Sequence, residues 1–105
     1  MRTLRFNVRA QAISRDPACD FGGLVAGSAG YLKAYFALDA AWKGCAVAAS
    51  FWREGQEYAV PVVGGECEIP AEALCGPVFA VSLTGRRGDA YRISTGRAYV
   101  RQEVV

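Results

Sequence analysis

The chain has 105 residues, 52% of them hydrophobic, which predicts one globular domain over 1–105 and excludes a disordered chain. Its formal net charge of +2 is too small to predict a nucleic-acid-binding protein, which needs a strongly basic surface. No apolar run reaches the length of a membrane span, and the N-terminus lacks the apolar stretch of a signal peptide. We therefore expect synthesis in the cytoplasm.

The first half of the chain alternates apolar and polar residues with the period of a β-strand. Residues 4–9 form the first such segment. Residues 31–38 form a stronger one, which places Phe36 on one face and Tyr35 on the other. Between them, the stretch 14–30 contains an Asp-Pro step and several glycines, and it predicts a long irregular loop.

The middle of the chain continues with strands over 45–52, 57–63 and 66–69. Gly55 lies in the expected hairpin turn between the first two, where a positive φ is needed. Pro61 has no N–H to donate to a central ladder. The segment 57–63 is therefore predicted to be an edge strand or to carry a bulge.

A single helical turn is predicted at Pro70–Leu74, because Pro suits the first helical position and Ala, Glu and Leu favour helix. Further strands are expected over 77–84, 90–95 and 98–104, and alternation in the first of them turns Phe79, Val81 and Leu83 inward. About seven to eight short strands, separated by turns, predict an all-β fold: an immunoglobulin-like antiparallel β-sandwich.

The chain carries no set of residues that is typical of catalysis. It has no histidine, the usual general acid or base near neutral pH. Glu66 and Glu68 share a strand face, but such a pair is typical of an exposed polar face. We therefore expect no catalytic residue, no cofactor and no enzymatic activity.

The four cysteines have no spacing typical of a metal site, so no metal is expected. Cys45 and Cys67 lie within apolar strand patterns and are predicted to be buried. Cys19 follows a loop and is predicted to be exposed. Free thiols fit cytoplasmic synthesis, and a disulfide between Cys67 and Cys75 is the alternative.

Aromatic side chains give the clearest surface signal. If Phe36 faces the core, Tyr35 faces away from it, and the same alternation turns Trp52 outward on the following strand. We expect the two to form a neighbouring pair, either a protein interface or a sugar-stacking platform, unless the loop 14–30 covers them. Two adjacent arginines lie in a Gly-flanked turn, and solvated turn charges are their simpler interpretation. The candidate binding residues are Trp52, Tyr35, Tyr91, Arg86 and Arg87.

A succession of short motifs extends over about three-quarters of the chain. They are Tyr31-Leu32 at a strand start, Trp42-Lys43-Gly44, Phe51, Tyr58, Cys67-Glu68-Ile69-Pro70 with Leu74, Phe79 to Gly85, and Ile93-Ser94-Thr95. In this order the sequence resembles a family of small phage proteins related to the N-terminal domain of the baseplate upper protein of phages that infect Gram-positive bacteria. No single motif is specific; their succession carries the resemblance.

The resemblance implies an immunoglobulin-like domain of a phage or prophage virion that anchors a fibre or receptor-binding module in the tail, baseplate or head. The expected partners are other virion proteins and further copies of the chain. The edge strand near Pro61 and the last strand, 98–104, are candidates for β-augmentation. A run of small residues also predicts close packing against a partner. Its members are Ala40, Ala41, Ala46, Ala48 and Ala49.

Two other functions stay open at this point. One is a carbohydrate-binding module for glycans of the host surface, with Trp52, Tyr35 and Tyr91 as stacking residues. The other is a small phage-encoded inhibitor of a host defence protein. A glycan-binding module works as a monomer, whereas an assembly protein is expected to form oligomers, so the oligomeric state separates these functions.

Overall fold

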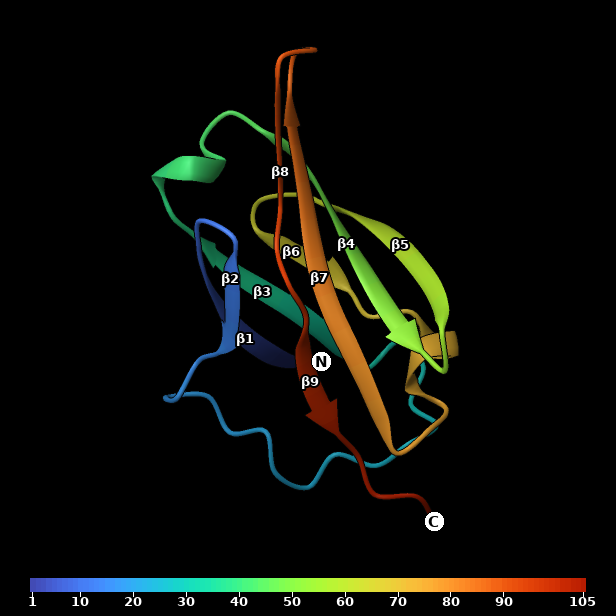
Figure 1. The fold of residues 1–105 in the computed structure, drawn as a ribbon. Helices are drawn as coiled ribbons and strands as arrows, with labels where there is room; N and C mark the ends of the chain where they lie inside the picture. Colours follow the sequence, from blue (N-terminus) through green and yellow to red (C-terminus); the bar gives the residue numbers. More distant parts are fainter.

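Nine β-strands form two sheets that pack face to face in the computed structural model, which describes residues 1–105 (Figure 1). The first sheet has the order β2-β1-β3-β6, and its strands are β1 (Arg2–Arg9), β2 (Ala12–Arg15), β3 (Leu32–Leu38) and β6 (Glu66–Glu68). The second has the order β5-β4-β7-β8, with β9 also paired to β7. Its strands are β4 (Ala46–Arg53), β5 (Gln56–Val62), β7 (Val78–Arg87), β8 (Tyr91–Ser94) and β9 (Ala98–Arg101). The predicted all-β sandwich is confirmed.

Two short 3-10 helices connect the strands: η1 (Ala40–Trp42) and η2 (Ala71–Leu74). The second confirms the helical turn predicted near Pro70–Leu74. None of the helices combines the length and the apolar character that crossing a lipid bilayer requires.

One pairing departs from the predicted antiparallel pattern. β1 and β3 run parallel, with Leu4 beside Ala34 and Phe6 beside Phe36. The rings of Phe6 and Phe36 stack with their centroids 5.5 Å apart, so the pairing places two large side chains together in the core. Alternation along a strand reports which face is buried, and it carries no information about the direction of the neighbouring strand.

After the first strand, residues 10–13 are compatible in sequence with its continuation or with a second short strand after a kink. The structure has the second strand, which forms a hairpin with the first and brings the number of strands to nine. Ala10 takes φ of 50°, in the left-handed region that favours glycine, in the turn between β1 and β2. The Asp39 carboxylate accepts the N–H of Ala10 at 2.8 Å and also caps η1 through the N–H of Ala41. This long-range contact, absent from the local pattern, supports the turn.

The core lies between the two sheets and is formed by their inward-facing residues. Its largest fully buried side chains are Phe6, Phe36, Phe51, Phe79, Leu4, Leu32, Ile69, Leu74, Leu83, Val8, Val81 and Val100. The inward faces predicted for β3, β4 and β7 are confirmed. Trp42 closes one end of the core: it is 2% exposed, and its indole N–H donates to the carbonyl of Ala10 at 2.9 Å.

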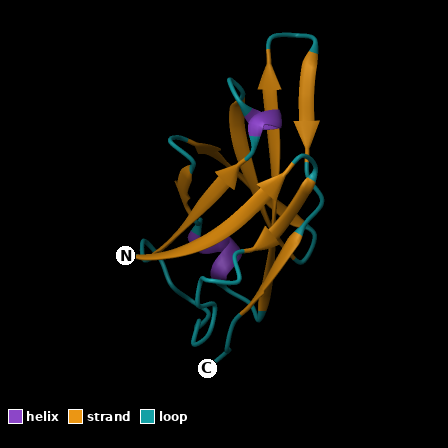
Figure 2. Cartoon of the chain, turned by 90° about the vertical axis from the view of Figure 1, so that its left-hand side faces the viewer, coloured by secondary structure: helices purple, strands orange, loops and turns teal.

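β7 is the longest strand and belongs to two pairings. Its first half, from Val78, pairs with β9, and its second half, to Arg87, pairs with β8. At the break between β8 and β9, the Thr95 hydroxyl accepts the N–H of Leu83, which continues the ladder. Figure 2 shows that the β7–β8 hairpin projects beyond the rest of the sandwich.

The two predicted turns around β5 are tight. Glu54 and Gly55 take φ of 51° and 79° between β4 and β5, as a two-residue hairpin of this hand requires. Gly64 and Gly65 take φ of 61° and 79° between β5 and β6. β5 is an edge strand of its sheet, which confirms the prediction from Pro61.

The last strand ends at Arg101, earlier than predicted. The chain beyond it is covered by the long loop: Glu103 donates its N–H to Leu24, and its carbonyl accepts the N–H of Ala26, both at 2.8 Å. Leu24 is 4% exposed, so the loop belongs to the core at this end. An added strand therefore finds this part of the last edge already occupied.

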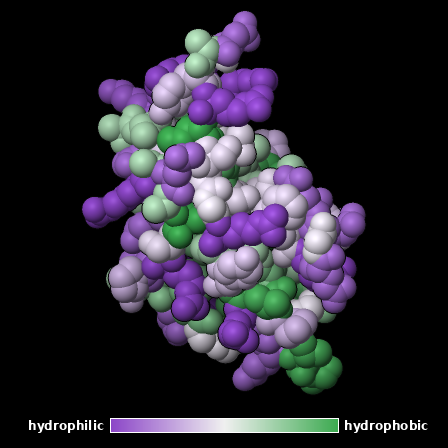
Figure 3. Space-filling view, in the orientation of Figure 1, coloured by the Kyte–Doolittle hydropathy of each residue, from purple (hydrophilic) through white to green (hydrophobic).

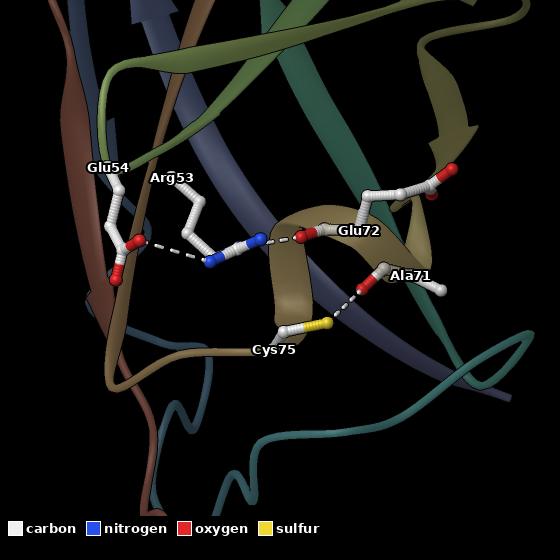
Figure 4. Close-up of polar contacts among 5 residues, drawn as sticks. All are labelled: Arg53, Glu54, Ala71, Glu72 and Cys75. Atoms are coloured by element: carbon white, nitrogen blue, oxygen red, sulfur yellow. Dashed lines mark hydrogen bonds and ion pairs between the residues drawn. The ribbon is translucent and has the colours of Figure 1, made fainter.

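Side-chain contacts fix η2 to the end of the second sheet at which β4 and β9 end and β7 begins. Figure 4 shows the Arg53 Nε donating to the carbonyl of Glu72 at 2.8 Å, while its Nη1 lies 3.4 Å from the Glu54 carboxylate. Buried Gln102 follows β9 and donates to the carbonyls of Leu74 and Gly76 at 3.2 and 3.0 Å. These contacts join η2 to β4 and to the residue that follows β9.

Candidate functional site

The outer face of the β5-β4-β7-β8 sheet, called the open face here, is not covered by any other element of the chain. Figure 3 views it directly: pale and green atoms lie in its middle among purple hydrophilic side chains, which are also frequent around its outline. A shallow groove of about 490 Å³ crosses it. The lining residues are Ala46, Val47, Ala48, Ala59, Val60, Pro61, Thr84, Arg86 and Arg92.

The groove follows from the strand register. Ala48 on the central strand β4 lies between Pro61 of β5 and Thr84 of β7, and all three point outward with little side-chain volume. One step along the strand, Ala46 lies beside Arg86. Small side chains form the floor, and longer ones stand beside it, so the sheet is hollow on this side. The floor is apolar, and its contact with water is unfavourable.

Two arginines border the groove at the β7–β8 hairpin. Arg86 and Arg92 are direct cross-strand partners, and both are exposed. Neither is in an ion pair. The two ion pairs of the molecule are Lys33–Glu66, between β3 and β6, and Arg53–Glu54, at the β4–β5 turn. Like charges opposite each other destabilise a sheet, so an anionic group between these guanidinium groups would be favourable.

The predicted residues Arg87 and Tyr91 lie on the other face of this hairpin and have structural contacts. The Arg87 guanidinium donates to the carbonyl of Lys43 at 2.6 Å and lies 4.2 Å from the centroid of the Tyr91 ring. The Tyr91 hydroxyl donates to the carbonyl of Ala41 at 2.5 Å. Together they fasten the hairpin to the η1 connection, which holds Arg86 in position beside the groove.

Trp52 lies on the open face, at the end opposite the two groove arginines. Its indole N–H donates to the Ser82 hydroxyl at 3.0 Å. The Arg97 guanidinium lies 3.8 Å from the ring centroid and covers one face of the ring. Trp52 is therefore half-buried by its own chain, through Arg97 and not through the loop 14–30.

The predicted pairing of Tyr35 with Trp52 is wrong. Tyr35 is on β3 of the first sheet, whereas Trp52 is on β4 of the second, so the two side chains point outward on opposite sides of the sandwich. The Tyr35 ring is instead approached by the Arg5 guanidinium at 4.9 Å. The connection through η1 crosses from one sheet to the other, and consecutive strands in the sequence are not neighbours here.

The groove itself was only partly visible in the sequence. The alanine run contained its signal, since Ala46 and Ala48 point outward, but Ala49 is fully buried and Ala40 lies in η1. Arg92 was missed, because nothing in its local sequence distinguishes it from other strand-face arginines. Its register opposite Arg86 makes it part of the site.

All four thiols are free, so the alternative disulfide between Cys67 and Cys75 is not formed. Cys67 is buried, as predicted, and desolvation raises its pKa to about 12. Cys45 and Cys19 are both half-buried, which corrects the buried and exposed positions predicted for them. The Cys19 sulfur accepts the N–H of Arg5 at 3.4 Å, a contact between the loop and β1.

His, Cys, Asp and Glu residues do not gather in any group of three or more that could hold a metal ion. The fold and the groove thus define an all-β sandwich domain with one open sheet face, which is hollowed by a groove with an apolar floor. No protein-family model matches the chain, and no curated protein matches it.

Proposed function

We propose that the chain is a structural or adaptor protein of a phage or prophage virion, which acts through protein–protein contacts of its open face. The observation that carries the proposal is the groove: its apolar floor lies around Ala48, and Arg86 and Arg92 border it without acidic partners. An apolar centre with charged residues at its border is the usual composition of a protein contact surface. The motif succession from Tyr31 to Thr95 supplies the connection to phage proteins.

In this function the sandwich acts as a rigid spacer between neighbours and performs no chemical step. The open face binds one neighbour, and the uncovered edge of β5 offers backbone groups to another by β-augmentation. Pro61 limits that edge, since it lacks an N–H, and so protects it from uncontrolled strand addition. The protein would be made in the bacterial cytoplasm and reside in the virion after assembly.

The two alternatives find less support in the contacts. Stacking of a sugar needs a free aromatic face, but Arg97 lies over Trp52, and Tyr91 is held by Arg87. Tyr35 is on the other sheet, so the three aromatics cannot form one platform. An inhibitor of a host defence protein would use the same kind of surface as a virion protein, and only its location in infected cells separates the two.

The test is co-purification of the tagged chain with phage particles, for the wild type and for Ala48→Arg. The Arg side chain fills the groove floor, so we expect at least a tenfold loss of the variant from particles. Ala37→Arg is the matched control, on the outer face of β3 in the other sheet, and it should be retained. Absence of the wild type from particles would reject the virion function, and its capture on one host protein would favour the inhibitor.

A further inference from the structure

The charges of this chain are segregated along the sequence. Residues 54–85 contain five glutamates and no lysine or arginine, whereas residues 86–101 contain five arginines and one aspartate. The acidic part includes β5, β6 and η2, and the basic part includes the end of β7 with β8 and β9. β5 and β8 are the opposite edges of the second sheet, and β6, which follows β5 in the chain, belongs to the first sheet. The acidic β5–β6 segment therefore lies away from the basic β8 edge.

The acidic side carries an exposed apolar side chain on a rigid turn. Val63 is 79% exposed at the β5–β6 turn. Val63 and Glu66 exchange both backbone hydrogen bonds, at 3.0 and 3.1 Å, so the turn is held at its base. Glu66 and Glu68 follow on exposed positions of β6. We call residues 63–68 the acidic turn.

The acidic turn and the groove are complementary in shape and in charge. The Val63 side chain is apolar and prominent, and the groove floor at Ala46 and Ala48 is apolar and hollow. The carboxylates of Glu66 and Glu68 lie next to Val63 in the acidic turn, and the guanidinium groups of Arg86 and Arg92 border the groove.

Lys33 is the cation that faces the acidic turn from within the same molecule. Its ammonium group lies 3.2 Å from a Glu66 carboxylate oxygen, and it is the register partner of Glu68. The pair is exposed, and surface pairs of this kind contribute little, so a bidentate arginine from outside can compete for these carboxylates.

From this complementarity we infer that a second copy of the chain docks its acidic turn into the groove. The groove lies on the outer face of one sheet, and the acidic turn lies where the chain crosses to the other sheet, so the contact joins different surfaces of the two copies (Figure 1). Such a heterologous contact repeats from copy to copy and produces a ring or a filament. The inference rests on the proposed function and deepens it, because it identifies the neighbour bound by the open face as another copy of the chain.

Sedimentation equilibrium of the full chain, at low and at moderate salt, tests the inference with charge reversals. The groove variant is R86E/R92E, and the turn variant is E66K/E68K. We expect the wild type to associate, more weakly as salt rises, and each variant to weaken association at least tenfold. The variant with all four changes re-creates opposite charges across the contact and should recover most of the wild-type association.

The control is R9E/R101E, which changes the net charge as much as R86E/R92E does, at two exposed arginines outside the groove. It should associate as the wild type does, and circular dichroism should show that every variant keeps its fold. A wild type that stays monomeric would overturn the inference. Failure of the variant with all four changes to recover association would also overturn it, because the two charged groups would then not face each other across the contact. So would a control that weakens association as much as R86E/R92E. A monomeric protein that still enters particles would overturn this inference alone and leave the proposed function standing.

Discussion

Cys67 is the residue whose chemistry is changed most by its position in the fold. It lies on the inner face of β6, 8% exposed, and desolvation raises its pKa from 9.0 to about 12. At neutral pH it is a small apolar thiol in the core. Exposed Cys75, whose S–H donates to the carbonyl of Ala71 at 3.4 Å (Figure 4), is the thiol open to reagents.

The raised pKa of Cys67 gives stability a defined pH dependence. Between pH 9 and about 12 the folded protein holds this proton and the unfolded chain does not, so the free energy of unfolding falls as pH rises. From pH 8 to pH 10.5 the loss due to this group should be about 2 kcal/mol. Urea unfolding at both pH values, compared with Cys67→Ala, isolates it. An equal loss in the variant would mean that other groups cause the dependence.

At the scale of elements, the contact between β7 and η1 depends on a missing side chain. Gly85 faces the Trp42 ring, and a Cβ at this position would lie 2.8 Å from two ring carbons. Trp42 is itself almost fully buried, so it cannot move aside without loss of its hydrogen bond to Ala10. Glycine is therefore needed here for space, and its φ is not the reason.

Gly85→Ala should lower the free energy of unfolding by about 1–3 kcal/mol, the usual cost of overpacking a core. In a Trp42→Leu background the same change should cost much less, because the smaller side chain leaves room for the methyl group. Denaturant unfolding of the wild type, the two single variants and the double variant gives the coupling. Additive effects would show that the ring and the glycine do not interact as described.

Hydrophobic alternation predicts which face of a strand is buried, but not which strand lies beside it. Alternation identified the inner faces of β3, β4 and β7 correctly, because burial on one side leaves a period of two in the chain. It did not identify the turn at Ala10, since that turn depends on Asp39, far along the chain. It also placed Trp52 and Tyr35 together, because pairing between strands is decided by the whole fold.

At the scale of the molecule, an elongated sandwich of 46 × 29 × 21 Å exposes one sheet face that is hollowed by a groove with an apolar floor. The groove depends on register: small residues of β4 and β5 meet at one level, and Arg86 meets Arg92 at the next. The sequence indicated the small residues and one of these arginines, but only the assembled sheet joins them into one surface. That surface is the basis of the proposed assembly function.

The mass of the purified protein in solution, measured by light scattering at two concentrations, tests the open face most directly as a contact surface. We predict that the wild type and Ala37→Arg are larger than a monomer and grow with concentration. We also predict that Ala48→Arg is a folded monomer, because its side chain fills the groove. A monomeric wild type, or an Ala48→Arg variant as large as the wild type, would contradict self-assembly through the open face.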